Sequence, residues 1–303
     1  MRGEGNLRGM TRGRIAGVDS PGDALRAAGV IPSKRRGQNF LVQGAVADRI
    51  VAMAELRPGD EVVEIGPGLG VLSERILAAP VLMLHLVELD RELAARLRGR
   101  LAGSFELIEA DFLKIDLGRI ARHPPIKVIG NLPFNVAAAI ARKLTEHRDL
   151  IARMVLMFQR EVGERLRAGP GEAAYGALSA LTALDWEIPR HFRVEAGSFH
   201  PRPNVDAEVL CFVPRAVPLY SPTPRSQVRA VIRAGFAVRR KNLRNALGAG
   251  LGMRAQAVEA ALAAAGIDPA QRAERLGAED FVRLARAIET VNQGEEPQQL
   301  RDA

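Results

Sequence analysis

Short apolar runs of strand length alternate with segments of helical period along the first two thirds of this 303-residue chain. The strand-like runs are residues 61–65, 81–87, 105–108, 127–129 and 154–158, and the helical segments are residues 46–56, 72–77, 91–101 and 136–144. Buried strands that alternate with helices are typical of a parallel sheet with helices on both faces. The pattern therefore predicts an α/β fold with a doubly wound, mostly parallel sheet.

The pattern changes toward the C-terminus. Two further β-type runs, residues 188–194 and 205–213, predict an antiparallel hairpin at the sheet edge. Four prolines between residues 214 and 224 indicate a linker, and the segments 227–247, 254–265 and 279–289 have helical period, with breaks at 248–252 and 266–269. We thus expect a basic, mostly disordered extension (1–33), a sheet domain (34–214), a small helical domain (215–290) and a frayed tail (291–303).

Composition narrows the class of protein. No run of about 18 uncharged apolar residues occurs, and arginines occupy the N-terminus where a secretory signal needs an apolar stretch, so we expect a cytoplasmic protein without a membrane partner. The single cysteine, Cys211, excludes an intrachain disulfide and a cysteine-based zinc site, and we expect no metal. A net charge of +8 and a pI near 10.4 favour a polyanionic partner.

A glycine-rich turn joins the first strand to the following helix. Its glycines, Gly66, Gly68 and Gly70, let the chain bend sharply and let a ligand approach the backbone. A dinucleotide fingerprint needs its third glycine at the position of Val71, so nicotinamide binding is disfavoured. Glu88, about 20 residues further on, ends the second strand, where an acid is expected to hold ribose hydroxyls.

A second acid, Asp111, follows the third strand. It is placed to accept a hydrogen bond from the exocyclic amine of an adenine. The alternative interpretation makes the glycine loop a plain tight turn, and makes Asp90 and Asp111 helix N-caps. We favour the cap for Asp90 and a ligand-binding role for Glu88 and Asp111, because three successive strand ends carry the expected chemistry together.

The fourth strand ends in the tetrapeptide Asn131, Leu132, Pro133 and Phe134, at the edge where such sheets bind ligands. The amine of adenine is a poor nucleophile because its lone pair is delocalised into the ring. The side-chain oxygen of Asn131 and a backbone carbonyl such as that of Leu132 could hold both amine hydrogens, and Phe134 could stack on a flipped-out base. The alternative is a proline-containing turn in which Asn131 bonds its own backbone.

Several stretches together resemble one family. They are residues 37–41, 64–70, Glu88, Asp111, 131–135, 158–162, 199–206 and 239–247, in the family's order over roughly residues 34–290. In these stretches the chain resembles the ribosomal RNA adenine dimethyltransferases, in particular their bacterial small-subunit branch. One departure is Phe134, where that branch usually has tyrosine.

The resemblance implies a Rossmann-like sheet that binds S-adenosyl-L-methionine, followed by a small C-terminal helical domain. It also implies dimethylation of the N6 amines of two adjacent adenines near the 3′ end of 16S rRNA, within an immature small ribosomal subunit. By motif match and from the glycine loop, the cofactor residues would be Asn39, Leu41, Gly66, Gly68, Glu88, Asp111 and Asn131. We expect the enzyme to be a monomer.

Two basic clusters are candidates for phosphate contacts. We expect RNA binding by Lys34, Arg35, Arg36, Arg239, Arg240, Lys241 and Arg244, although a solvated helix face is the alternative. Three other functions stay open: a 23S rRNA adenine methyltransferase of the macrolide-resistance type, a non-catalytic ribosome assembly factor with the same fold, and a nicotinamide-dependent dehydrogenase.

Overall fold

A single twisted sheet forms the centre of the protein, and the computed structural model describes residues 37–238 and 241–294. The strand order is β4-β3-β2-β5-β6-β9-β7. The strands are β2 (Glu61–Ile65), β3 (Met83–Glu88), β4 (Glu106–Glu109), β5 (Ile126–Asn131), β6 (Ile151–Gln159), β7 (Trp186–Val194) and β9 (Ala207–Pro214). Strands β2 to β6 are parallel, which confirms the predicted doubly wound α/β class and its Rossmann-like arrangement.

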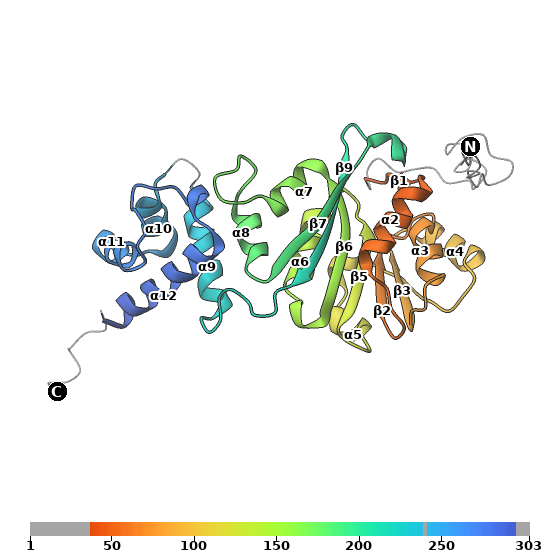
Figure 1. The fold of residues 1–303 in the computed structure, drawn as a ribbon, viewed down its shortest axis with the longest axis horizontal. Coiled ribbons are helices and arrows are strands. Elements are labelled where there is room, and N and C mark those ends of the chain that lie inside the picture. Colours follow the sequence, from red (N-terminus) through yellow and green to blue (C-terminus); the bar gives the residue numbers. More distant parts are fainter. Residues whose placement is uncertain (1–36, 239–240, 295–303) are drawn as a thin grey trace, which may run out of the picture.

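The predicted antiparallel pair lies at the end of this sheet. Strand β9 pairs with β7 and also with β6, so the later strand is inserted between the two earlier ones (Figure 1). Two short strands, β1 (Phe40–Leu41) and β8 (Phe199–His200), form a separate antiparallel pair that the sequence pattern did not predict.

Helices cover both faces of the sheet because the strands are apolar on both sides. The first group is α2 (Gly44–Ala54), α3 (Val71–Leu77) and α4 (Arg91–Arg100), and the second is α5 (Leu117–Ile120), α6 (Ala137–Thr145), α7 (Arg160–Arg167) and α8 (Ala177–Ala183). Along β2, Val62 packs toward the first group, whereas its neighbour Val63 packs toward the second. Short 3-10 helices occur at Phe112–Lys114 (η2), Arg148–Leu150 (η3), Ala196–Ser198 (η4) and Ala273–Arg275 (η5).

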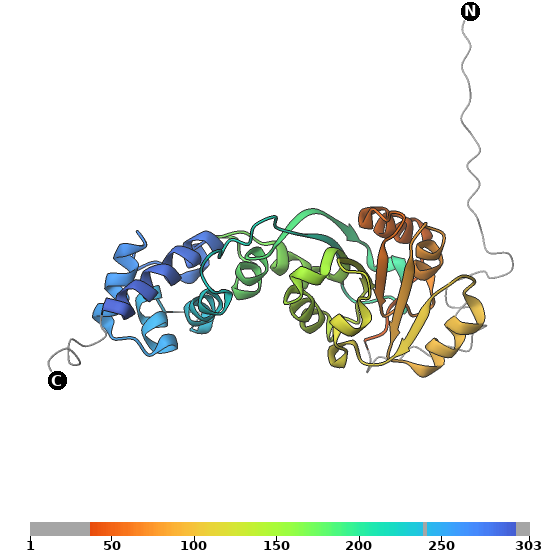
Figure 2. The same cartoon turned by 90° about the horizontal axis from the view of Figure 1, so that it is seen from below.

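The C-terminal region is helical, as predicted. It consists of α9 (Arg225–Ala237), α10 (Leu243–Leu251), α11 (Ala255–Ala264) and α12 (Ala278–Gly294). Figures 1 and 2 show these helices at one end of an elongated molecule and α3 and α4 at the other. Helix α12 continues over residues 291–294, which we expected to begin a frayed tail. The predicted extension 1–33 and the end of the tail lie outside the described residues.

The predicted helix 227–247 and its break at 248–252 were wrong. The helix ends at Ala237, and Asn242 caps a new helix by accepting a hydrogen bond from the Asn245 amide at 3.1 Å. This second helix continues past residue 248 to Leu251. The reason is packing: a Cβ added at Gly250 would lie 2.6 Å from the Cβ of Ala234, so the glycine allows α9 and α10 to cross closely.

Helix α8 also belongs to the core of the C-terminal region. Its Ala180 and the adjacent Leu184 are buried among the side chains of α9 to α12. Buried contacts therefore cross the boundary predicted near residue 214, and the exact domain division stays a prediction. Within the described part of the chain, every helix is too short or too polar to cross a lipid bilayer.

Candidate active site

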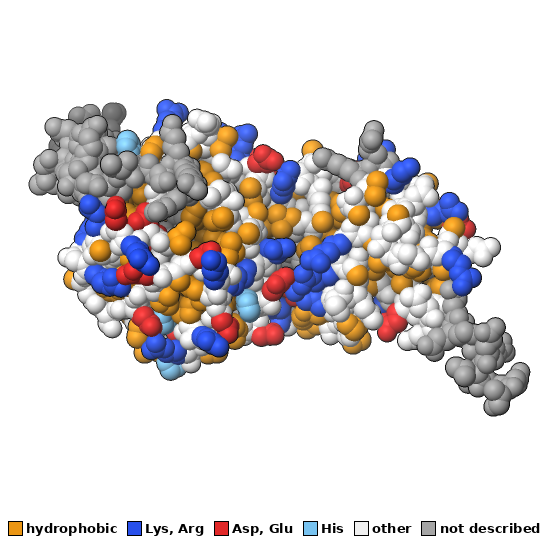
Figure 3. Space-filling model, turned by 180° about the vertical axis from the view of Figure 1, so that it is seen from behind, with side chains coloured by type: hydrophobic (Ala, Val, Ile, Leu, Met, Phe, Trp, Pro, Cys, Tyr) orange, Lys and Arg blue, Asp and Glu red, His pale blue; other side chains and the backbone are white. Residues whose placement is uncertain are grey.

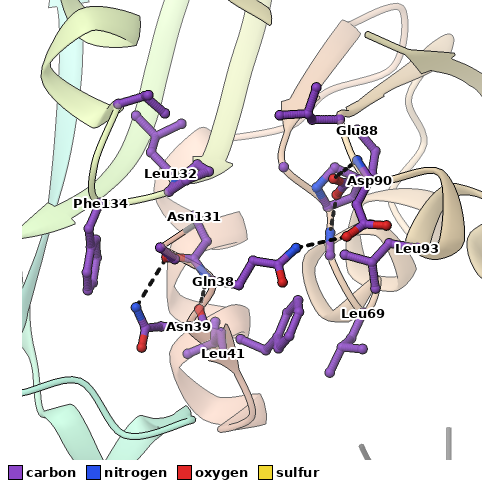
Figure 4. A pocket seen from close by; sticks show the side chains of 18 of the residues that line it. Gln38, Asn39, Leu41, Leu69, Glu88, Asp90, Leu93, Asn131, Leu132 and Phe134 are labelled. Atoms are coloured by element: carbon purple, nitrogen blue, oxygen red, sulfur yellow. Dashed lines mark hydrogen bonds between the residues drawn. The ribbon is translucent and has the colours of Figure 1, made fainter. Parts of the chain in front are cut away.

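A cavity of about 640 Å³ opens at the carboxyl edge of the parallel strands. We call it the edge cavity, and it is lined by residues 37–41, 66–69, 71–72, 88–90, Leu93, Asp111, Leu113 and 131–136. Every residue that the sequence predicted for the cofactor or the chemistry lines this cavity. Figure 4 shows Leu132 and Phe134 on one side, and Glu88, Asp90 and Leu93 on the other.

The glycine loop forms one wall of the cavity. Gly66, Gly68 and Gly70 have φ angles of +68°, +56° and +79°. Residues that carry a Cβ rarely adopt this left-handed backbone conformation, whereas glycine adopts it readily. A Cβ on Gly68 would lie 3.0 Å from the Phe40 ring, and one on Gly66 would lie 3.6 Å from the Asn131 backbone oxygen. The loop thus keeps its backbone close to neighbouring segments and leaves room for a ligand.

Glu88 is held rigidly at the end of β3. Its Oε2 accepts from the Gly68 amide at 3.1 Å, and its Oε1 accepts from the Asp90 amide at 2.9 Å. Burial raises the pKa of this carboxyl, although the backbone hydrogen bonds oppose the shift. Each carboxylate oxygen can accept more than one hydrogen bond, so Glu88 can still bind a pair of hydroxyls in the cavity.

Glu64 lies beneath the same loop and is fully buried. The Ser73 hydroxyl donates to its Oε2 at 2.6 Å, while its Oε1 has no hydrogen-bond partner among the described residues. Burial raises the pKa of Glu64 to about 8, with a further contribution from Glu88. The two neighbouring carboxyls Glu64 and Glu88 thus disfavour each other's charged form.

Asp90 caps α4, as we expected, and Asp111 caps the short helix η2, as its alternative interpretation predicted. Asp90 Oδ1 accepts from the Glu92 amide at 3.0 Å, and Asp111 Oδ1 accepts from the Leu113 amide at 3.0 Å. Both residues also line the edge cavity. For Asp111 the cap does not exclude a ligand role, because it uses only one of the two carboxylate oxygens.

Asn131 ends β5 and faces the cavity beside the glycine loop. Its Nδ2 donates to the backbone oxygen of Asn39 at 3.1 Å, so its Oδ1 is directed to act as an acceptor. A turn does follow, because the Val136 amide donates to the Pro133 oxygen at 3.1 Å. However, the side chain of Asn131 bonds a segment 92 residues away instead of its own backbone, which the turn interpretation required.

Two other residues of the tetrapeptide, Leu132 and Phe134, differ in how deeply their side chains are buried. Leu132 is buried and packs into the core, so its side chain anchors the loop, whereas Phe134 is partly exposed at the cavity. The Phe134 ring meets Phe199 edge-to-face, with centroids 6.3 Å apart. One face of Phe134 can therefore receive a flat ring.

The N-terminal segment 37–41 closes the cavity, and sequence reasoning used only part of it. Asn39 and Leu41 were predicted as site residues, whereas Gln38 was not. The Gln38 Nε2 donates to Asp90 Oδ2 at 3.2 Å and so joins this segment to the end of β3 (Figure 4). The motif 37–41 already contained Gln38, but nothing in the sequence indicated its partner.

Of the predicted RNA-binding cations, the structure describes Lys241 and Arg244, and neither of these two lines the edge cavity. Lys241 lies between α9 and α10 in the chain, whereas Arg244 lies on α10 and forms an ion pair with Glu259 at 2.5 Å. Lys34, Arg35, Arg36, Arg239 and Arg240 lie outside the described residues. On the face in Figure 3, Lys and Arg side chains extend over both the sheet region and the helices, with acidic side chains among them. No cluster of three or more potential metal ligands occurs within 37–238 or 241–294.

Relatives of known sequence support one family. The family described as ribosomal RNA adenine dimethylase matches residues 33–290. A ribosomal RNA small subunit methyltransferase A from Syntrophotalea carbinolica is 48% identical over 259 residues, which cover 85% of this chain and 97% of the relative. The protein of the same name from Geobacter sulfurreducens is 42% identical, with 87% and 98% covered.

Solved structures agree on the fold. A dimethyladenosine transferase from Plasmodium falciparum has a TM-score of 0.68 at 22% identity, covering 84% of this chain and 98% of that one. The 23S rRNA methyltransferase ErmE has a TM-score of 0.66 at 26% identity, covering 83% and 100%. From the match over most of its length, together with the edge cavity and its tetrapeptide, the chain belongs to the ribosomal RNA adenine dimethylase family.

Proposed function

We propose that this protein uses S-adenosyl-L-methionine to dimethylate the N6 amines of two adjacent adenines near the 3′ end of 16S rRNA. The observation that carries the proposal is the orientation of Asn131, whose amide nitrogen is engaged by Asn39 while its oxygen is left as an acceptor in the edge cavity. An adenine amine needs acceptors of this kind and no metal. The family and the names of the two bacterial relatives point to the same chemistry.

The residues of the edge cavity fit the cofactor. Gly66 and Gly68 offer backbone where a Cβ would fill the space, and Glu88 is fixed where it can accept from two ribose hydroxyls. Asp111 can accept from the adenine amine, and the apolar Leu69, Leu93 and Leu113 can enclose the base. When bound, the cofactor supplies an electrophilic methyl group on a sulfonium.

The protein's task is then to orient the target amine. The Asn131 Oδ1 and a backbone carbonyl of the tetrapeptide accept its two hydrogens, which favours a more tetrahedral nitrogen with an available lone pair. Phe134 stacks on the flipped base, and the absent tyrosine hydroxyl does not affect the stacking face. Orientation of this kind can contribute about 7–11 kcal/mol to lowering a barrier.

The preferred RNA is that of the small subunit. Both bacterial relatives match over nearly their whole length at 42–48% identity, whereas ErmE, the 23S enzyme, is 26% identical. We infer a monomeric, cytoplasmic enzyme that acts on an immature small subunit, with cations of the C-terminal region, Lys241 among them, on phosphates. The 23S methyltransferase and the non-catalytic assembly factor are the alternatives to be tested against it.

The direct test is to incubate the protein with methyl-labelled S-adenosylmethionine and either unmodified small subunits or large subunits, and then to map the label. We expect dimethyladenosine at two neighbouring positions near the 3′ end of 16S rRNA. Label chiefly in 23S rRNA would favour the resistance-type enzyme. Binding to small subunits with no label in either rRNA would favour the assembly factor.

A further inference from the structure

A lysine outside the edge cavity bonds one of the loops that form it. Lys143 lies on α6, and its Nζ donates to the backbone oxygens of Phe112 at 2.9 Å and Leu113 at 3.0 Å, and to that of Ile115. An ammonium group carries three N–H donors. All three of them therefore go to carbonyls of one short loop.

The other hydrogen bonds of that loop are local, and its apolar side chains Phe112, Leu113 and Ile115 pack against the core. The loop follows β4, the outermost strand, whose sole partner in the sheet is β3. Within the loop, Asp111 caps η2 and Phe112 is buried, with its ring centroid 5.3 Å from the Lys143 ammonium. Asp111 and Leu113 both line the edge cavity. A shift of this loop would therefore move a carboxylate and an apolar side chain of the site together.

The other end of α6 adjoins the catalytic tetrapeptide. Val136, its N-cap, lines the edge cavity, and the buried Ile140 and Leu144 fix the helix on the sheet. Lys143 thus joins a helix that begins beside the tetrapeptide to a loop whose Asp111 and Leu113 line the same cavity. Burial lowers the pKa of Lys143, while the nearby Asp111 and Asp116 raise it, so these two carboxylates favour the charged form that the three carbonyls need.

We propose that Lys143 is a positioning residue for the cofactor's adenine, because it fixes the 111–115 loop at the place where Asp111 meets the adenine amine. The inference rests on the proposed function, since it takes the edge cavity as the cofactor site. Lys143 itself does not line the edge cavity and acts through Asp111.

The test compares two ligands by calorimetry: S-adenosylhomocysteine and S-inosylhomocysteine, in which an oxygen replaces the adenine amine. We expect the wild-type protein to prefer the adenosine compound. Lys143→Met keeps an unbranched side chain but removes the donors and the charge. It should weaken S-adenosylhomocysteine about tenfold, the loss expected for one good hydrogen bond, and weaken the inosine compound much less.

Arg142→Met is the matched control, because Arg142 is the exposed neighbour on the same helix, and it should behave as wild type. Lys143→Gln keeps two N–H donors and should show an intermediate preference, and it carries the test if the methionine variant does not fold. Equal weakening of both ligands, or an unchanged preference in a folded variant, would overturn the proposal. If the wild-type protein bound neither ligand, the proposed function itself would fail, and this inference with it.

Discussion

The side-chain amide of Asn131 donates to the backbone oxygen of Asn39 across 92 residues of sequence, at 3.1 Å. This bond joins the end of β5 to the segment that closes the edge cavity. The Nδ2 of Asn131 thus holds the cavity wall, and under the proposed function its Oδ1 would also accept from the target amine. Substitutions at Asn131 should therefore affect both the chemistry and the cofactor site.

We expect Asn131→Ala to lower the methyl-transfer rate about 100-fold or more, a loss comparable to that of one preorganised polar group at a reacting centre. The affinity for small-subunit RNA should change little, since phosphates dominate it. Single-turnover rates and filter binding would measure the two quantities. Asn292→Ala, an exposed asparagine on α12, is the control. A normal rate in the Asn131 variant would reduce the tetrapeptide to a turn.

Glu88→Gln should weaken S-adenosylmethionine binding by about tenfold, because charge-assisted hydrogen bonds contribute about 1.5–3 kcal/mol. Glu88→Ala should be worse, since it also removes the acceptor for the Gly68 and Asp90 amides. Calorimetry provides the measurement, with the exposed Glu92→Gln as a control on the neighbouring helix. Unchanged affinity in a folded Glu88→Gln variant would remove Glu88 from the cofactor site.

Gly68→Ala should destabilise the protein by about 1–2 kcal/mol from its left-handed backbone alone, and the added Cβ would press on the Phe40 ring from 3.0 Å. Gly99→Ala is the opposite case, because Gly99 is inside α4 with open space around it. That change should stabilise by about 0.5–1 kcal/mol. Urea unfolding of both variants checks the contrast, and equal effects of the two changes would contradict it.

Glu64 should make stability depend on pH. The folded protein holds its proton up to a pKa of about 8, above the ordinary value of 4.5, so the folded state binds more protons between these values. The unfolding free energy should accordingly fall as the pH rises from about 4.5 to about 8. Glu64→Gln, which stays neutral, should gain stability relative to wild type over this interval. A constant difference between the two proteins at pH 5 and pH 8 would contradict the shift.

Lys241 and Arg244 should differ in their effect on RNA binding. Arg244 is bonded to Glu259, whereas Lys241 has no ion pair with any described residue. Lys241→Ala should reduce the salt dependence of binding by about one unit of slope, while Arg244→Ala should change it less. Titrations of small-subunit RNA at several salt concentrations would measure the slopes. Equal slopes for both variants would show that the ion pair opens on binding.

The sheet was predictable because its inner strands are continuous apolar runs, each followed by a periodic helix. Strands β1 and β8 could not be predicted, because a strand of two residues is too short to show an alternation of apolar and polar side chains. The break between α9 and α10 was missed because both helices bury apolar faces in one cluster, so the periodicity continues across the break. Gly250 suggested the end of a helix, but it lies within α10, where the absence of a side chain lets this helix pack closely against Ala234 of α9.

The site was predictable where the residues lie in local motifs at strand ends, as with Gly66, Glu88 and Asn131. It was not predictable where a role depends on a distant partner. Gln38 becomes important only because Asp90 lies opposite it, and Lys143 only because the 111–115 loop ends beside α6. Side-chain chemistry can be read from a sequence, whereas these pairings are set by the packing of the sheet.

The small pair of β1 and β8 has a consequence for how the protein is made. Phe40 and Leu41 pair with His200 and Phe199, and the Val42 amide donates to the Ser198 oxygen at 2.9 Å. During translation the wall formed by residues 37–41 must wait for partners that are synthesised much later, and β9 must still be added between β6 and β7. A growing chain that ends before Ser198 has the glycine loop, the tetrapeptide and the partners of Gln38 and Asn39, but it lacks the strand that pairs with Phe40 and Leu41. Cofactor binding is therefore expected to arise late in synthesis, and not from the N-terminal half alone.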